Sequence, residues 1–196
     1  DCRRAASELL SAARKAGERP GVCVAQAELS IVLNFYGEFQ QALNRSNEAL
    51  KNYDEASWAF YTHRLGWEPS VVANCQKAIA ALFLGRLEDA QAASAKAISF
   101  AEALGHPAVN LYAYCYAGLF PAFLAGDFAG IRYYASRCIP LSKSYNVPQY
   151  VAWSDCLGAA ALAEEGKTEE AVQSFENGRR VKLGLDYIGH GAITEL

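Results

Sequence analysis

One six-residue pattern occurs four times in the chain, as Gly37-Glu-Phe-Gln-Gln-Ala42, Gly85-Arg-Leu-Glu-Asp-Ala90, Gly126-Asp-Phe-Ala-Gly-Ile131 and Gly166-Lys-Thr-Glu-Glu-Ala171. The glycines lie 48, 41 and 40 residues apart. An apolar, helix-like stretch precedes each glycine, and an amphipathic stretch follows it. A tight turn between two antiparallel helices needs a residue with positive φ, which glycine adopts at little cost. The pattern therefore predicts four helix hairpins.

A proline stands where the first helix of each hairpin is expected to begin: Pro20, Pro69, Pro107 and Pro148. Proline is tolerated in the first helical turn because its missing N–H group would have no partner there. A lone helix is expected over residues 2–16, and a loop or short helix within 53–68. The predicted helix pairs are 21–36 with 38–52, 70–84 with 86–104, 107–125 with 127–145, and 148–165 with 167–183.

Small residues recur seven positions beyond the last residue of each pattern. Two helices that cross closely need small side chains on the face where they touch, so these positions are expected to lie between the helices of a pair. They are Ala49, Ala97, Cys138 and Gly178.

A period of about 40 residues with two helices in each repeat is typical of an α-solenoid. The spacing matches tetratricopeptide-type repeats lengthened by about one turn per helix. We therefore predict an all-α fold, a right-handed α-solenoid of tetratricopeptide-like helix pairs. It would form one helical-repeat domain over residues 1–196, and the unpaired first helix favours a fragment of a longer chain. The predicted repeats cover about 21–52, 70–104, 107–145 and 148–183.

The composition agrees with a helical protein. The chain holds 36 alanines among 196 residues and only 6 prolines, and alanine is the best helix former. The formal net charge of −3 disfavours a nucleic-acid-binding surface. No two of the six cysteines form a C-x-x-C pair, so we expect reduced, buried thiols in a cytoplasmic protein, among them Cys75, Cys115 and Cys156.

Residues 107–126 carry no charge and are long enough to cross a bilayer. The stretch contains Pro107, Asn110 and Pro121, and no basic cluster flanks it. A buried helix of a helical array fits these residues better than a membrane span, so no membrane partner is expected.

Five segments stand in an order that carries a resemblance: Tyr53-Asp54, 66–72, 84–90, 101–107 and 162–171. Together they resemble the C-terminal tetratricopeptide-like region of large bacterial proteins with a class III adenylate/guanylate cyclase domain and an AAA-type ATPase module. The resemblance covers about residues 20–183 and implies a regulatory interaction or sensor module. Glu68 stands where the family usually has Asp, and 159–161 are alanines where a tryptophan is usual. No cyclase or ATPase motif lies in the chain, so neither activity is implied.

The motifs that could carry chemistry are weak. Residues 161–168 end in Gly166-Lys167-Thr168 and satisfy the loosest phosphate-binding loop pattern, but a helix rather than a strand is expected before them. The histidines, at 63, 106 and 190, have no ligand partner at metal-binding spacing. No nucleophile motif is present. We therefore expect no enzymatic activity, no cofactor and no metal site.

The groove positions of tetratricopeptide repeats, counted back from the turn glycines, give the candidate binding residues Asn34, Tyr116, Phe120 and Trp153. The three aromatic residues would form a patch of the kind that interaction surfaces favour. The alternative is that they are ordinary packing between helices. If they line the groove, Tyr116 and Trp153 should be half-exposed.

Two functions remain open. The first is a non-catalytic scaffold in a bacterial signalling protein, whose groove binds a protein or peptide segment, including one of its parent chain. The second is a small-ligand sensor with an apolar pocket around Tyr116 and Trp153 that controls an attached effector domain. A pocket of ligand size with convergent polar groups would favour the second function. The sequence leaves oligomer formation open.

Overall fold

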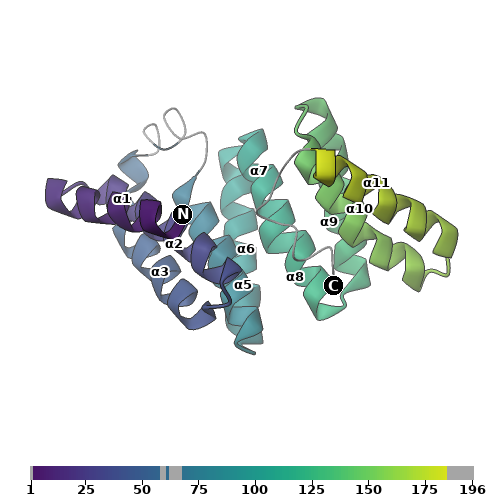
Figure 1. The fold of residues 1–196 in the computed structure, drawn as a ribbon, viewed down its shortest axis with the longest axis horizontal. Coiled ribbons are helices and arrows are strands. Elements are labelled where there is room, and N and C mark those ends of the chain that lie inside the picture. Colours follow the sequence, from purple (N-terminus) through teal and green to yellow (C-terminus); the bar gives the residue numbers. More distant parts are fainter. Residues whose placement is uncertain (1, 58–60, 62–67, 185–196) are drawn as a thin grey trace. The chain divides into compact units, whose positions relative to one another are not determined.

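The computed structural model describes residues 2–57, 61 and 68–184, and this part of the chain is helical and contains no strand (Figure 1). The prediction of an all-α fold is confirmed. The elements, in order, are α1 (Cys2–Ala16), α2 (Arg19–Phe35), α3 (Phe39–Asn52), the 3-10 helix η1 (Glu55–Ser57), α5 (Pro69–Phe83), α6 (Leu87–Leu104), α7 (Pro107–Ala113), the π-helix η3 (Tyr114–Leu119), α8 (Phe120–Ala125), α9 (Phe128–Ser144), α10 (Pro148–Glu164) and α11 (Thr168–Gly184).

The predicted turns are confirmed. Gly37, Gly85, Gly126 and Gly166 have φ between +67° and +76° and separate α2 from α3, α5 from α6, α8 from α9, and α10 from α11. In each turn the N–H of the residue after the glycine donates to a carbonyl five residues earlier, over 2.8–3.0 Å. This is the Schellman closure of a helix end, which requires the left-handed backbone conformation that glycine supplies.

The predicted helix starts are also confirmed. Pro69, Pro107 and Pro148 are the first residues of α5, α7 and α10, and Pro20 is the second residue of α2. Residues 185–196 and all of 58–67 except Tyr61 lie outside the described residues. The predicted loop or short helix within 53–68 therefore lies largely outside them.

The chain divides into two compact units, residues 1–117 (unit 1) and 118–196 (unit 2). In unit 1, Ala49 and Ala97 are fully buried; in unit 2, Cys138 is fully buried and Gly178 is buried. A Cβ atom on Gly178 would lie 2.6 Å from the carbonyl oxygen of Ala152. The small residues that the pattern singled out therefore lie in the interior, and Gly178 marks the close approach of α11 to α10.

All the cysteines except Cys2 are buried, and none of the six forms a disulfide bond. The prediction of reduced, buried thiols at Cys75, Cys115 and Cys156 is confirmed, with exposed fractions of 0%, 1% and 5%. Burial raises the pKa of the Cys75 and Cys138 thiols, the latter to about 12. Thiols held in the neutral form are poor nucleophiles and poor metal ligands.

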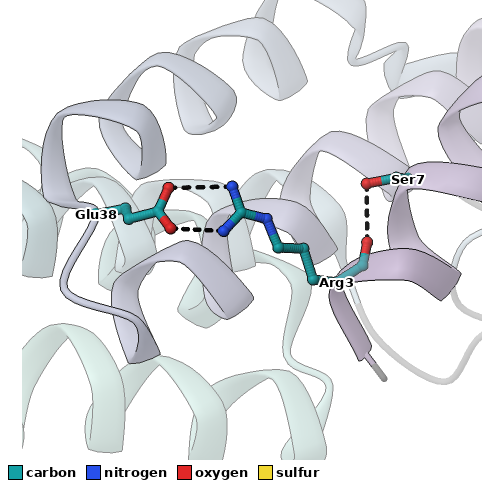
Figure 2. Close-up of polar contacts among 3 residues, drawn as sticks. All are labelled: Arg3, Ser7 and Glu38. Atoms are coloured by element: carbon teal, nitrogen blue, oxygen red, sulfur yellow. Dashed lines mark hydrogen bonds and ion pairs between the residues drawn. The ribbon is translucent and has the colours of Figure 1, made fainter.

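Arg3 links helix α1 to the turn between α2 and α3 through an ion pair with Glu38 (Figure 2). Its guanidinium group donates to both carboxylate oxygens of Glu38, over 2.6 and 3.2 Å, and lies 6.0 Å from the centre of the Tyr36 ring. Leu10 of α1 also packs in an apolar cluster with Leu29 of α2. The lone first helix is thus part of the core of unit 1.

The substitution Arg3→Ala is expected to lower the free energy of unfolding by about 0.5–1 kcal/mol, because the ion pair is bidentate but partly exposed. Urea unfolding followed by circular dichroism measures the loss. Arg4→Ala is the matched control, since Arg4 pairs with Glu8 only on the exposed face of the same helix. Equal losses in the two variants would contradict a role of Arg3 in fastening α1.

Candidate interaction surface

The four predicted binding residues fall in two units and two environments. Asn34, on α2, and Tyr116, in η3, belong to unit 1 and are half-buried. Phe120, on α8, and Trp153, on α10, belong to unit 2 and are only 7% and 5% exposed. Each pair is therefore described within its own unit.

In unit 1, Asn34 and Tyr116 are joined by two residues that the sequence analysis did not select. The Asn34 amide nitrogen donates to the backbone oxygen and to the side-chain oxygen of Gln76, both over 2.9 Å. The Gln76 amide nitrogen donates to the Tyr112 hydroxyl over 3.0 Å. The Tyr112 ring contacts the Tyr116 ring at a centroid distance of 4.5 Å. We call these four residues the amide–tyrosine array.

The array connects three first helices of hairpins: α2 supplies Asn34, α5 supplies Gln76 and α7 supplies Tyr112. Gln76 is only 3% exposed, and a buried amide without hydrogen bonds would cost about 1–3 kcal/mol. Its bonds to Asn34 and Tyr112 therefore favour one relative position of the three helices. Asn34, Tyr112 and Tyr116 are half-buried as whole residues, and side-chain amides and phenols of adjacent helices can hold a polar chain by hydrogen bonds.

Sequence signals for the two missed residues exist. Gln76 is a polar residue within the apolar run of α5, at a position where the side chain has to find a hydrogen-bond partner in the interior. Tyr112 precedes Tyr116 by one helical turn, a spacing that brings two aromatic rings into contact. Neither signal identifies the hydrogen-bond partner of the residue. Gln76 bonds to Asn34 and to Tyr112, and each of these lies more than 35 residues from it along the chain.

In unit 2, Phe120 and Trp153 form part of the core. Their rings meet edge to face, with a centroid distance of 6.3 Å and an interplanar angle of 85°. The expectation that Trp153 is half-exposed is therefore wrong. The apolar residues of α10 are spread around the helix and form no single stripe, so its sequence does not mark the side that faces solvent. The count from Gly166 placed Trp153 by analogy with a shorter repeat.

A second polar cluster lies at the start of α5. Glu68 is 1% exposed, and its carboxylate accepts a hydrogen bond from the Ser70 N–H over 3.1 Å, which caps the helix. Burial raises the pKa of Glu68, and the nearby Ser70 and Tyr53 groups lower it in part. Burial and the charge of Glu68 raise the pKa of the Cys23 thiol to about 12. Within the described residues Glu68 forms no ion pair.

The substitution Glu68→Gln is expected to make the protein more stable than wild type at neutral and alkaline pH. The pKa of Glu68 lies above its ordinary value of 4.5 in the folded protein. The folded protein therefore favours the protonated carboxyl group. The contribution of Glu68 to the free energy of unfolding is complete below pH 4.5 and is lost as pH rises through the pKa of the folded protein. Glutamine keeps a cap oxygen and carries no charge, so the Tm difference between variant and wild type should grow from pH 4 to pH 8. A pH-independent difference would contradict the raised pKa.

No other chemical site emerges from the part of the chain that the structure describes. There, no group of three or more His, Cys, Asp or Glu side chains could hold a metal ion. Gly166 forms the turn between α10 and α11, so a helix, as expected, precedes the loose phosphate-binding pattern of residues 161–168. The Lys167 ammonium group pairs with the Glu165 carboxylate over 2.8 Å.

One described helical stretch, Pro107–Ala125, has the length and apolarity needed to cross a bilayer, and 56% of its apolar window is buried in the protein. A buried core helix of a soluble protein passes the same test, so the stretch is weak evidence for a membrane location.

The class that the structure defines is an all-α protein built from helix hairpins. No protein-family model matches the chain, and no curated protein sequence matches it.

Proposed function

We propose that the chain is a non-catalytic helical-repeat scaffold that binds a protein or peptide segment through the amide–tyrosine array of unit 1. The proposal includes the finer architecture, a right-handed solenoid of tetratricopeptide-like pairs. It also includes a cytoplasmic setting in a bacterial signalling protein, to which the sequence resemblance points. The partner is a protein or a segment of the parent chain, rather than nucleic acid or a membrane.

The array is the observation that carries this proposal. It places hydrogen-bonding side chains from α2, α5 and α7 in one connected set, and Asn34, Tyr112 and Tyr116 are half-buried. An extended chain presents amide and carbonyl groups at regular intervals, and side-chain amides and phenols can bond to both kinds of group. Tyrosine contributes a rigid, amphipathic surface of the type enriched at binding hot spots.

The ligand-sensor alternative needs Trp153 as a pocket residue. The Trp153 side chain is buried against Phe120, so it is not available to a ligand in this structure. The observations therefore favour the scaffold.

The test begins with a photo-crosslinking amino acid, p-benzoylphenylalanine, placed at Tyr116 in cells of the source organism. The control position is Tyr145, at the end of α9, which is 57% exposed and outside the array. Mass spectrometry identifies proteins crosslinked from position 116 and absent at position 145. Overlapping peptides of those proteins are then titrated against the purified chain by fluorescence anisotropy.

The expected result is a peptide whose affinity falls about 30-fold in Tyr116→Ala, the effect of losing a hot spot of about 2 kcal/mol, and also falls in Asn34→Ala. Tyr145→Ala should bind like wild type. Circular dichroism checks that each variant is folded. If folded Tyr116→Ala and Asn34→Ala variants both bind as tightly as wild type, the array is not the binding surface.

A further inference from the structure

Basic side chains from three helices of unit 1 gather around one acidic residue, Glu48. The Lys51 ammonium group donates to the Glu48 carboxylate over 2.7 Å. The pKa of Glu48 is lowered, first by this hydrogen bond and the charge of Lys51, and further by the charges of Arg14 and Arg45. The Arg19 guanidinium group reaches the same place, because it donates to the Lys51 carbonyl oxygen over 3.3 Å. We call Arg14, Arg19, Arg45 and Lys51 the basic cluster.

The packing of α1, α2 and α3 brings these side chains together. Arg14 lies in the last turn of α1, and Arg19 is the first residue of α2. A Cβ atom on Gly21 would lie 3.1 Å from the Cβ atom of Ala13, so the end of α1 packs closely against the start of α2. Helices α2 and α3 form the first hairpin, so the start of α2 lies beside the end of α3, which carries Lys51. The fold of unit 1 therefore holds the basic cluster in place.

The basic cluster carries more positive charge than its surroundings neutralise. Within the described residues, no carboxylate lies within ion-pair distance of Arg14, Arg19 or Arg45. Arg45 instead donates to the neutral side-chain oxygen of Gln26 over 3.4 Å. The whole chain has a formal net charge of −3, so this local excess of positive charge does not follow from a generally basic composition.

The basic cluster is accessible from outside the protein. Arg14, Arg19 and Lys51 are exposed, and Arg45 is half-buried. A guanidinium group presents its N–H donors in a planar fork that matches the two oxygens of a carboxylate. Opposite charges across an interface speed the encounter of two partners and fix their relative register. Three arginines without a carboxylate partner are therefore suited to bind carboxylates of another chain.

An acidic protein segment fits the basic cluster better than nucleic acid does. A nucleic acid carries a negative charge on every phosphate, so both Glu48 and the net negative charge of the chain would oppose its binding. The cluster also contains no aromatic side chain on which a base could stack. A protein segment can place carboxylates opposite the arginines and leave the position opposite Glu48 uncharged.

We propose that the basic cluster is a docking surface for an acidic segment of a protein partner, rich in Asp and Glu. The proposal uses residues outside the amide–tyrosine array and does not depend on the proposed function. It requires two opposite effects. Neutralising cations of the cluster should weaken binding, and neutralising Glu48 should strengthen it, because Glu48 competes with the partner for the same cations.

The test is a titration of the full chain against fluorescein-labelled octaglutamate, followed by fluorescence anisotropy at about 50 mM NaCl, where exposed charges are weakly screened. The variants are the double substitution Arg14→Gln with Lys51→Gln and the single substitution Glu48→Gln. The matched control is Arg4→Gln with Lys96→Gln, which removes the same charge from exposed positions of unit 1 outside the cluster. Circular dichroism checks that each variant is folded.

We expect the affinity for octaglutamate to fall about fivefold or more in the double variant, the effect of losing two exposed ion pairs, and to rise about twofold in Glu48→Gln. The control pair and Asn34→Ala should bind like wild type. Raising the salt to about 200 mM NaCl should weaken binding to the wild-type protein, because screening increases.

Three results would overturn the proposal. The first is that the wild-type chain does not bind octaglutamate at low salt. The second is an equal loss of affinity in the control pair and in the double variant, which would make binding a matter of net charge alone. The third is tighter binding of an oligothymidylate of matched charge, which would make the cluster a nucleic-acid surface.

Discussion

The substitution Trp153→Ala is expected to lower the free energy of unfolding by about 3–5 kcal/mol, the usual cost of removing a large aromatic side chain from a core. The Trp153 side chain is 5% exposed and meets Phe120 edge to face. Such an aromatic pair adds about 0.5–1.5 kcal/mol beyond the apolar area that it buries. Truncation also leaves a cavity that the neighbouring helices cannot close completely.

Urea unfolding followed by far-ultraviolet circular dichroism measures this loss, and Tyr145→Ala is the control. Tyr145 is 57% exposed, so its truncation should change stability by no more than about 0.5 kcal/mol. A loss below about 1 kcal/mol for Trp153→Ala would mean that the side chain is not a core residue and would restore it as a groove candidate.

The second large effect is expected for Gly178→Ala, which should destabilise the protein by about 3 kcal/mol or more. The added Cβ atom would lie 2.6 Å from the Ala152 carbonyl oxygen, 2.7 Å from the Cys156 sulfur and 2.9 Å from the Cys156 backbone nitrogen. Two of these atoms belong to the backbone of α10, so relief requires that α10 and α11 separate. The higher helix propensity of alanine, about 1 kcal/mol, is too small to compensate.

Gly158→Ala is the matched control for this effect, because Gly158 also lies in unit 2, within α10. Its added Cβ atom would meet the nearest side-chain atom, on Ala135, at 3.8 Å, an ordinary contact. Alanine should therefore stabilise this position by about 0.5–1 kcal/mol. If thermal melts show that the two variants change Tm in the same direction, close helix packing does not constrain Gly178.

The hairpin organisation could be predicted from sequence because its signals are local. A turn that needs positive φ selects glycine, and a first helical turn accepts proline, so Gly85 and Pro69 mark the two ends of α5 without knowledge of any distant residue. The small residue at 178 was predictable for a similar reason, since its position follows from the turn by helical periodicity.

The binding surface was predictable only in part. Asn34 and Tyr116 were selected by their register, but the residue that joins α2 to α7, Gln76, depends on a contact between helices more than 30 positions apart. The burial of Trp153 was missed because the apolar residues of α10 form no single stripe that would mark its covered side. The π-helical turn was missed because no residue pattern in 107–125 distinguishes it from a regular helix.

The four turn glycines also have a consequence in terms of chirality. At Gly85, for example, φ is +73° and no atom lies within 4 Å of the position of a side chain. An L residue is disfavoured there by its own backbone rather than by its surroundings. A D-alanine, whose mirror-image preference is for positive φ, fits both the backbone and the open space. Because a D-alanine also restricts the unfolded chain, each turn would be about 0.4–1 kcal/mol more stable with it than with glycine. The four turns therefore favour a residue of D configuration. Glycine, which is achiral, adopts the same positive φ without the steric cost that an L residue would carry.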